Sequence, residues 1–371
     1  MDWIYLDYNA STPIDTSVRD AVVPYLEKAY GNPSSTHWAG IPARQAIDDA
    51  RSKVADLFGC SHDEIVFTSG GTEANNHALK GVFFANGARG HFITSAVEHP
   101  AIVEPLRFLE TLGAEITIVP VDRFGMVDPA DVLDAIKSDT LLVSVMHANN
   151  EVGTIQPIKE ISAICRNAGV LLHTDAAQSV GKIPSGVNEL GVDLMSIAAH
   201  KFYGPKGIGA LYIKNRIRLE SFMHGAGHEA GRRAGTENIP LVVGLGQAAL
   251  LAKDLEPMFR VAQLRDLFWS RLIAVFDERI VLNGHPEQRL PNTLNVSFLG
   301  HVGAEVLAAM PEVAATTGSA CHSGSVEMSP VLKAMNTPED VAAGTIRFSL
   351  GRMTRDSDIE QVVGRLKNII G

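Results

Sequence analysis

The chain of 371 residues is long enough for two to three domains of roughly 150 residues each. Its content of 46% hydrophobic and 20% charged residues is typical of a folded protein with a sizeable core, which excludes a disordered chain. Acidic residues outnumber basic ones by 42 to 32, and the net charge of −10 argues against a surface that binds duplex nucleic acid, because such binding depends on cationic neutralisation of phosphates.

Short apolar runs alternate with amphipathic segments over the first two thirds of the chain. This alternation is typical of a mostly parallel sheet with helices on both faces. Prolines and glycines stand where helices begin and end. In chain order the predicted elements are strand 64–69, helix 72–81, strand 91–95, helix 99–112, strand 115–120, helix 129–138, strand 140–146, helix 157–168, and strands 170–174, 193–198 and 208–213.

The pattern changes after about residue 252. Helices 242–255 and 257–276 lead into strands at 279–282, 293–298 and 345–350, and a helix at 356–370 follows. We expect an α/β protein with a large domain at 15–252, built on a mostly parallel seven-stranded sheet, and a smaller α+β domain. The first 14 residues are too few to fold alone, and we assign them with 253–371 to the smaller domain.

Neither the cysteines nor the apolar segments point to an exported or membrane protein. Cys60, Cys165 and Cys321 are scattered and form no CxxC pair, which argues against a disulfide framework or a zinc site and favours a reducing cytoplasm. Residues 1–7 lack the cationic and apolar segments of a signal peptide. The longest nearly apolar stretch, 239–252, is shorter than the roughly 18 residues that span a bilayer.

Polar residues capable of chemistry directly follow five of the predicted strands. Ligands of open α/β sheets bind beyond the carboxyl ends of the strands, so five such groups at one edge predict a cofactor site. The five groups are Ser69 to Thr72, Glu98 and His99, Asn149 and Asn150, Asp175 to Gln178, and His200 and Lys201.

The glycine pair Gly70 and Gly71 at a strand-to-helix junction offers backbone N–H groups and a helix N-terminus to a phosphate. Such glycines more often simply form a tight turn. The chain has neither the GxGxxG of a dinucleotide fold nor the GxxxxGK[ST] of a P-loop, which argues against a nicotinamide or a nucleoside triphosphate.

Lys201 and Asp175 predict pyridoxal phosphate as the cofactor. Most lysines are solvated surface charges, but Lys201 follows an apolar strand, where a buried amine has a lowered pKa and can form a Schiff base. Asp175 ends another buried strand, where a carboxylate needs a cationic partner such as a protonated pyridine nitrogen. The alternative for Asp175 is a helix N-cap.

At this point the motifs resemble those of NifS/IscS-type cysteine desulfurases and selenocysteine lyases, which are fold-type-I pyridoxal phosphate enzymes of the class V aminotransferase superfamily. The similarity extends over nearly the whole chain. It is carried by Tyr5 to Ala10, Gly31 to Ser35, Phe67 to Glu73, Met146 to Gly153, Asp175 to Lys182, His200 to Gly207, Gly235 and Thr236, Pro291 to Val296, Gly318 to Cys321, and Ile346 to Arg352.

The resemblance implies roles for the residues of the site. Lys201 would hold the cofactor covalently, His99 would stack on its ring and assist proton transfer, Asp175 would pair with the ring nitrogen, and Gln178 would bind the ring hydroxyl. The phosphate would be held by Gly71, Thr72 and His200, with Thr236 reaching in from the second subunit of a homodimer. Asn150 and Arg347 would grip the substrate carboxylate. Taken singly, His99 could be a core histidine and Arg347 a surface ion pair.

One position departs from the family pattern. Two residues before His200 the family usually has a serine, and this chain has Ala198. We expect the loss of one phosphate hydrogen bond, a contribution of about 1 kcal/mol.

Cys321 lies among small polar residues, from about 318 to 330, that predict a mobile, exposed loop. An exposed thiol beside His322 can act as a thiolate nucleophile, whereas an unreactive surface thiol is the alternative. Cys60 and Cys165 stand in contexts that predict packed, inert side chains. The resemblance implies that Cys321 takes sulfur from L-cysteine as a persulfide, leaving L-alanine, and passes it to an acceptor protein such as an iron–sulfur scaffold.

Two further activities stay open at this level. Four features resemble selenocysteine lyases: the residues from Ala320 to Ser323, those from Ser329 to Leu332, those from His91 to Ser95, and Ala198. The selenium of selenocysteine leaves with less help than the sulfur of cysteine, because a selenol ionises more readily than a thiol. A pyridoxal phosphate aminotransferase would keep Lys201 but has no use for a cysteine in a mobile loop. A non-catalytic sulfur-assembly scaffold would need neither Lys201 nor Asp175.

Overall fold

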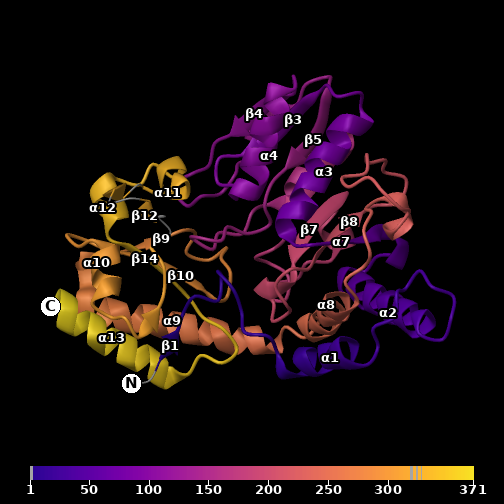
Figure 1. The fold of residues 1–371 in the computed structure, drawn as a ribbon. Coiled ribbons are helices and arrows are strands. Elements are labelled where there is room, and N and C mark those ends of the chain that lie inside the picture. Colours follow the sequence, from indigo (N-terminus) through magenta and orange to yellow (C-terminus); the bar gives the residue numbers. More distant parts are fainter. Residues whose placement is uncertain (1–2, 318–320, 323–324, 327) are drawn as a thin grey trace.

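The chain is organised around two sheets of unequal size (Figure 1). The computed structural model describes residues 3–317, 321–322, 325–326 and 328–371. The larger sheet has seven strands in the order β2-β8-β7-β6-β5-β3-β4. β8 runs antiparallel to both of its neighbours, and the other neighbouring pairs are parallel, which confirms the predicted sheet. Its strands are β2 (Ile65–Thr68), β3 (His91–Ser95), β4 (Glu115–Val119), β5 (Thr140–Ser144), β6 (Leu171–Asp175), β7 (Leu194–Ala198) and β8 (Gly209–Ile213).

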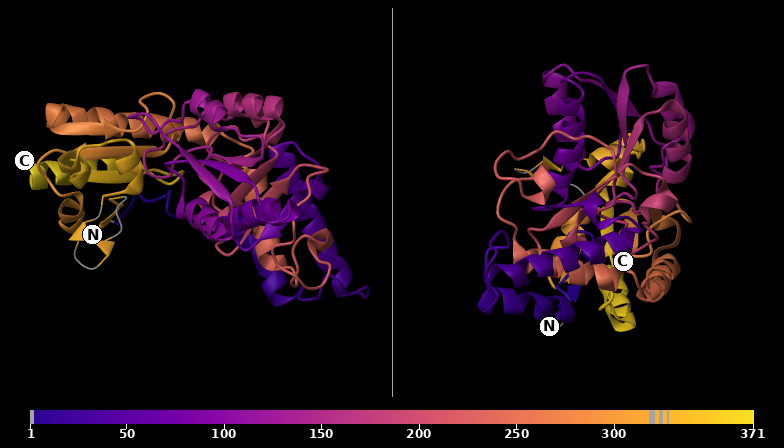
Figure 2. Two further views of the ribbon diagram at one scale, coloured as in Figure 1. Left: turned by 90° about the horizontal axis from the view of Figure 1, so that it is seen from above. Right: turned by 90° about the vertical axis from the view of Figure 1, so that its right-hand side faces the viewer.

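Helices cover both faces of this sheet, and Figure 2 shows them on either side of it. One apolar cluster joins one face of the strands to α3 (Gly71–Ala85) and α4 (Pro100–Thr111). A second cluster joins the opposite face to the remaining helices of this part, and α1 (Thr16–Glu27) packs on α8. These remaining helices are α2 (Gly40–Phe58), α5 (Pro129–Ala135), α6 (Ile158–Ala168), α7 (Val187–Leu190) and α8 (Ile239–Ala252).

α3 continues four residues beyond the predicted end at Gly81. Gly81 lies inside the helix and is close to a neighbouring segment. A Cβ at Gly81 would lie 3.0 Å from the Cβ of Leu219 and 3.1 Å from the backbone oxygen of Glu220. The glycine therefore allows close packing rather than ending the helix.

The smaller sheet is antiparallel, in the order β14-β10-β9, with β9 (Ile280–Asn283), β10 (Thr293–Phe298) and β14 (Thr345–Ser349). It shares a separate apolar cluster with α9 (Glu256–Phe276) and α13 (Asp356–Ile370). Both chain ends lie beside it (Figure 1). The other elements are β1 (Ile4–Tyr5), α10 (Gly303–Ala308), β11 (Val313–Ala314), β12 (Cys321–His322), β13 (Ser325–Val326), α11 (Pro330–Ala334) and α12 (Glu339–Ala343), with 3₁₀ turns η1 (His62–Glu64), η2 (Ala199–Lys201), η3 (Glu229–Gly231) and η4 (Asp277–Arg279).

The N-terminal segment joins the smaller sheet and then continues to the larger one. β1 pairs with β11, and Ile4 and Leu6 are buried in the core of the smaller sheet. Thr12 then hydrogen-bonds the backbone of His200, directly after β7. Residues 7–12 therefore bridge the two sheets.

The described residues contain neither a membrane-spanning helix nor a candidate metal cluster. Among the helices of this part of the chain, none has both the length and the apolar character needed to cross a bilayer. Within the same residues, no group of three or more His, Cys, Asp or Glu side chains could hold a metal ion.

Candidate active site

Nine of the predicted site residues line one cavity of about 420 Å³. The cavity lies where the parallel strands β3, β5, β6 and β7 end, and β14 closes it from the smaller sheet. This is the edge at which ligands of open α/β sheets bind. The nine residues are Gly71, Thr72, His99, Asn150, Asp175, Gln178, His200, Lys201 and Arg347.

Lys201 presents a partly buried amine to this cavity. It ends η2, directly after β7, and its Nζ donates hydrogen bonds to the backbone oxygens of Asn9 at 2.7 Å and Ala10 at 3.0 Å. Burial, reinforced by the positive charge of Arg347, lowers the pKa of Lys201 to about 8. A larger fraction of this amine is therefore uncharged at neutral pH than of an ordinary lysine, which makes it a better nucleophile and base.

Asp175 is the last residue of β6 and is buried, at 7% exposure. Its Oδ2 accepts a hydrogen bond from Asn75 Nδ2 at 2.7 Å, and its Oδ1 accepts one from the Ala177 backbone N–H at 2.9 Å. The helix N-cap alternative is wrong, because residues 176–182 form turns and the next helix begins at Val187. Both carboxyl oxygens of Asp175 therefore accept a hydrogen bond, which fixes the side chain at the end of β6.

His99 is the N-cap of α4, and its Nδ1 accepts a hydrogen bond from the backbone N–H of Ala101 at 3.0 Å. This contact places the proton of the neutral ring on Nε2. Burial lowers the pKa of His99; the charge of Lys201 acts in the same direction, and that of Asp175 opposes both. His99 is therefore a neutral imidazole with one N–H available at neutral pH.

The start of α3 forms a cradle suited to an anion. Gly70 precedes the helix with a φ of +153°, a conformation that side chains disfavour, and Gly71 and Thr72 are the first two helical residues. Helix N-termini present unpaired N–H groups to anions. Across the cradle, a Cβ on Gly71 would lie 3.4 Å from the Cβ of Ala198. Burial, with nearby lysines, lowers the pKa of His200 to about 4, so its ring is neutral.

Gln178 is held in one orientation from both ends. Its Nε2 donates to the backbone oxygen of Asn9 at 2.9 Å, and its Oε1 accepts from the buried Nζ of Lys182 at 2.8 Å. A backbone oxygen can only accept, so the amide nitrogen must face Asn9. The same Asn9 oxygen binds Lys201, which places the Gln178 N–H₂ group next to the lysine amine. Sequence analysis missed Lys182, although it stands four residues after Gln178.

Arg347 lies on β14 and faces the cavity with a side chain that is 7% exposed. Its Nη1 donates to the backbone oxygen of Asn150 at 2.8 Å, and its Nη2 forms an ion pair of 2.7 Å with Asp7 Oδ1. Its Nε is buried without a hydrogen-bond partner in the described part of the chain. The alternative of a surface ion pair is wrong, because the guanidinium is buried at the cavity wall.

Asn9 connects the groups around the cavity, and sequence analysis missed it. The side chain is 1% exposed; its Nδ2 donates to Thr293 Oγ1 at 2.8 Å and to the Asn150 backbone oxygen at 3.1 Å. Its Oδ1 accepts from Asn292 Nδ2 at 2.9 Å. Asn9 therefore ties the N-terminal segment to the smaller sheet and to the loop after β5. The motif from Tyr5 to Ala10 was visible in the sequence, but no pattern assigned it a function.

One predicted residue, Thr236, stands apart from the cavity. Thr236 lines a separate cavity of about 230 Å³ beside the ends of β2 and β8, together with Ser69 and Gly207. The predicted exposed, mobile position of the Cys321 side chain lies outside the described residues. The Cys321 backbone forms β12, which pairs antiparallel with β13. Burial raises the pKa of Cys60 and that of Cys165 to about 12, as expected for unreactive thiols.

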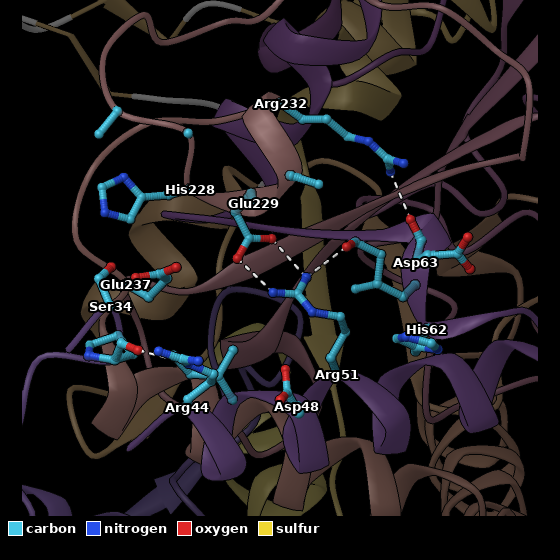
Figure 3. Close-up of a pocket in the computed structure, with 16 residues that line it drawn as sticks. Ser34, Arg44, Asp48, Arg51, His62, Asp63, His228, Glu229, Arg232 and Glu237 are labelled. Atoms are coloured by element: carbon cyan, nitrogen blue, oxygen red, sulfur yellow. Dashed lines mark hydrogen bonds and ion pairs between the residues drawn. The ribbon is translucent and has the colours of Figure 1, made fainter. Parts of the chain in front are cut away.

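A larger cavity of about 630 Å³ lies between α2 and the segment 226–237 (Figure 3). Arg51 of α2 points to Glu229, and both guanidinium Nη atoms reach the carboxylate at 2.7 Å. Glu229 also accepts from the Phe67 backbone N–H at 2.9 Å, which anchors the segment on β2. Arg233 of the same segment pairs with Glu73 of α3 at 2.8 Å. These contacts fix the segment that carries Thr236, which lines a cavity other than that of Lys201.

Comparison with known proteins gives one consistent family. The model of the class V aminotransferase family matches residues 4–362. The cysteine desulfurase IscS of Dictyoglomus turgidum is 50% identical over 99% of this chain and 94% of its own length. The IscS of Methanosarcina thermophila is 44% identical over 99% of this chain and 92% of its own length.

Solved structures agree with the sequence comparison. A NifS-like protein superposes with a TM-score of 0.92 at 35% identity, covering 99% of both chains. A structure described as SspA in complex with cysteine gives a TM-score of 0.84 at 36% identity, covering 94% of this chain and 98% of its own. Matches of this length and identity extend through both sheets and the cavity between them. The chain therefore belongs to the class V aminotransferase family.

Proposed function

We propose that the chain is a pyridoxal phosphate-dependent cysteine desulfurase, which converts L-cysteine to L-alanine and holds the sulfur as a persulfide on Cys321. The observation that carries the proposal is the pairing, in one cavity, of a lysine with a lowered pKa and a buried carboxyl group that accepts two hydrogen bonds. The desulfurase relatives, which match nearly the whole chain, supply the substrate class.

The residues of the cavity fit pyridoxal phosphate at each of its polar groups. The N-terminus of α3 and the neutral His200 suit the phosphate, Asp175 the ring nitrogen, the Gln178 N–H₂ the ring hydroxyl, and Lys201 the aldehyde. The buried Oδ1 of Asn75 has no hydrogen-bond partner among the described residues, as expected for a wall that awaits a ligand. When bound, pyridoxal phosphate supplies an electron sink for negative charge at the substrate Cα.

Lys201 and His99 are the groups that move protons in this proposal. A Lys201 amine with a pKa of about 8 exchanges a proton near neutral pH, as a base at the substrate Cα must. The Asn9 and Ala10 oxygens hold this amine at a fixed place when it is free. His99 brings a neutral N–H to the same cavity, where it can donate to an atom that gains negative charge.

Arg347 and Asn150 would bind the substrate carboxylate. Among the described residues the guanidinium has N–H groups without a partner, one of them on the buried Nε, and a planar fork binds both oxygens of a carboxylate. The side chain of Asn150 belongs to the same cavity wall. This contact would orient the substrate with its amine toward Lys201.

The sulfur step requires a thiolate, which we assign to Cys321. Its sulfur attacks the substrate sulfur, the substrate C–S bond breaks, and its electron pair remains on the carbon skeleton, which takes up protons to become alanine. Burial raises the pKa of both Cys60 and Cys165 to about 12, so neither supplies a thiolate at neutral pH. The persulfide then passes to an acceptor protein such as an iron–sulfur scaffold.

A homodimer in the cytoplasm is the assembly that we propose. Within one chain, Thr236 lines a cavity other than the one that holds Lys201, which is compatible with its serving the phosphate of a second copy. Large apolar side chains are exposed near α1 and α2, where a second copy would cover them: Leu26 is 67% exposed, Tyr30 76% and Trp38 80%. Persulfide chemistry and free thiols suit a reducing compartment.

The decisive experiment measures alanine formed from L-cysteine and from L-selenocysteine by the wild type and by Cys321→Ala. Loss of both activities in the variant supports the desulfurase. Activity retained on selenocysteine alone identifies a selenocysteine lyase. Ala198 and the motif from Ala320 to Ser323 favour this alternative. Borohydride reduction followed by peptide mapping must label Lys201; label on another amine, or none, contradicts the cofactor assignment.

A further inference from the structure

Asp7 contacts Arg347 from behind the cavity wall. Arg347 lines the cavity, whereas Asp7 is not among the described residues that line it. Asp7 Oδ1 lies 2.7 Å from Arg347 Nη2, and the two side chains are 22% and 7% exposed. The carboxylate of Asp7 therefore pairs with the guanidinium without occupying the place of a ligand.

The two contacts of Arg347 leave donors free for a ligand. A guanidinium has five N–H groups in a rigid plane. The Asn150 backbone oxygen accepts one from Nη1 and Asp7 accepts one from Nη2, while Nε has no partner in the described chain. Two fixed acceptors define the plane of the guanidinium, so the remaining N–H groups already point in a set direction.

Asp7 is itself fixed against the strand that carries Arg347. It forms a parallel bridge with Ser349, two residues after Arg347 on β14. Its backbone oxygen accepts hydrogen bonds from the N–H groups of Ala10 and Ser11, which close a tight turn. The backbone of Asp7 is therefore fixed beside the strand that carries Arg347, so this ion pair differs from one between two flexible surface side chains.

The charge of Asp7 also bears on affinity. L-cysteine and L-alanine carry the same α-carboxylate, so an Arg347 without a counter-ion would hold the product as strongly as the substrate. Asp7 offsets one positive charge at short range, where Coulomb interactions near a protein surface are strong. An offset guanidinium still binds a carboxylate through directed hydrogen bonds, but it binds less tightly than a lone cation would.

We propose that Asp7 is a positioning residue, which orients Arg347 for the α-carboxylate and limits the affinity of the site for amino acids. This proposal rests on the proposed function, in which Arg347 binds the substrate carboxylate. It predicts opposite effects of two substitutions. Asp7→Asn keeps an acceptor oxygen and removes the charge, whereas Asp7→Ala removes both.

The test is an equilibrium titration of the cofactor-loaded protein, followed by its visible absorbance, with L-alanine and with ethylamine, which lacks the carboxylate. We expect Asp7→Asn to lower the dissociation constant for L-alanine about fivefold and Asp7→Ala to raise it about fivefold. Ethylamine makes no contact with Arg347, so the change in its constant measures the effect of the Asp7 charge on Lys201, whose pKa that charge raises. The fivefold changes for L-alanine are expected relative to the ethylamine constant of the same variant. Asp20→Asn, which removes the same charge from an exposed pair with Arg19, is the matched control and should equal the wild type.

Asp7→Asn is nearly isosteric, so it remains informative even where Asp7→Ala fails to fold. Equal L-alanine constants for the wild type and Asp7→Asn overturn the proposal, and so does a parallel change in the ethylamine constant. Arg347→Met separates this inference from the proposed function. If Arg347→Met leaves L-alanine binding intact, the carboxylate role of Arg347 fails; if it abolishes that binding while Asp7→Asn has no effect, the role of Asp7 alone fails.

Discussion

At the scale of single residues, Ala198 stands where the family usually has a serine, and the serine can be restored by mutation. It lies beside Gly71 in the anion cradle and offers no hydroxyl group. We expect Ala198→Ser to lower the dissociation constant of pyridoxal phosphate about fivefold, because one neutral hydrogen bond contributes about 1 kcal/mol. The measurement is cofactor binding to the cofactor-free protein by absorbance. Ala198→Val adds bulk without a donor and should weaken binding; a serine variant that binds no better than the wild type contradicts the expectation.

The lowered pKa of Lys201 predicts how cofactor capture depends on pH. Only the uncharged amine attacks an aldehyde, so capture should accelerate as pH rises and level off above about 8, the pKa of Lys201, rather than above the 10.5 of an ordinary lysine. Mixing cofactor-free protein with pyridoxal phosphate at pH 6.5 to 10, in steps of about 0.5, measures this rate. Because Arg347 lowers the pKa of Lys201, Arg347→Met should move the midpoint upward. A wild-type midpoint near 10 would contradict the burial of the amine.

The residues that the sequence did not indicate share one property: they bind protein groups. Lys201, Asp175 and His99 could be found because each lies at the end of a strand or within four residues after it. Asn9 and Lys182 instead position other side chains. Asn9 binds Thr293, which lies far along the chain, whereas Lys182 binds Gln178, which lies four residues before it. Such contacts follow from packing, which no local pattern encodes. Asn75 had a signal that was not used, since it lies one helical turn after Gly71 and so faces the same edge.

At the scale of elements, the segment 226–237 depends on a buried ion pair. Glu229 and Ala230 have φ values of 49° and 54°, left-handed conformations that cost about 1 to 3 kcal/mol each outside glycine. Arg51 and the Phe67 N–H hold the Glu229 carboxylate, whose side chain is 2% exposed. We expect Arg51→Met to lower the free energy of unfolding by about 3 kcal/mol, because it leaves a buried charge unpaired.

Urea denaturation measures this effect, and the control is a double variant. Arg51→Met combined with Glu229→Gln removes the unpaired charge, so it should be more stable than Arg51→Met alone. If the single variant is at least as stable as the double variant, the ion pair does not anchor the segment.

The strands of the seven-stranded and three-stranded sheets were predicted closely, whereas the short strands β1, β11, β12 and β13 and the first two helices were not predicted. Buried parallel strands read as continuous apolar runs, which are easily recognised. α2 instead meets α8 through small residues: a Cβ on Gly246 would lie 2.6 Å from the Cα of Ala50. Close packing by alanine and glycine weakens the hydrophobic periodicity on which helix prediction depends. α1 also contains Pro24 in its last turn, and a proline inside a helix makes the end of that helix hard to predict from the sequence.

At the scale of the whole molecule, the apolar cluster of the larger sheet gives way to that of the smaller sheet between α8 and α9. Ala252 at the end of α8 packs in the cluster of the larger sheet, and Met258 near the start of α9 packs in that of the smaller sheet. The cavity lies between these clusters, and Asn9 and Arg347 close it from the smaller side. The boundaries 15–252 and 253–371 with 1–14 stay a prediction, and substrate binding would draw both parts together through Arg347.

The assembly can be tested by mixing two defective chains. Lys201→Ala lacks the amine but keeps Thr236, and Thr236→Ala keeps the amine but lacks the hydroxyl. If Thr236 serves the cavity of a second copy, a hybrid dimer contains one complete site, formed by Lys201 of one chain and Thr236 of the other. Thr236→Ala alone should bind pyridoxal phosphate about fivefold more weakly than the wild type, since one phosphate hydrogen bond is lost.

The hybrid, isolated with two different affinity tags, should bind one cofactor per dimer with the affinity of the wild type. The matched control combines Lys201→Ala and Thr236→Ala on one chain and pairs it with a wild-type partner. Its remaining Lys201 then faces a chain without Thr236, so its single site should show the weakened affinity. Equal affinities in the two hybrids would contradict a shared site, because the two arrangements differ only in which chain supplies the hydroxyl.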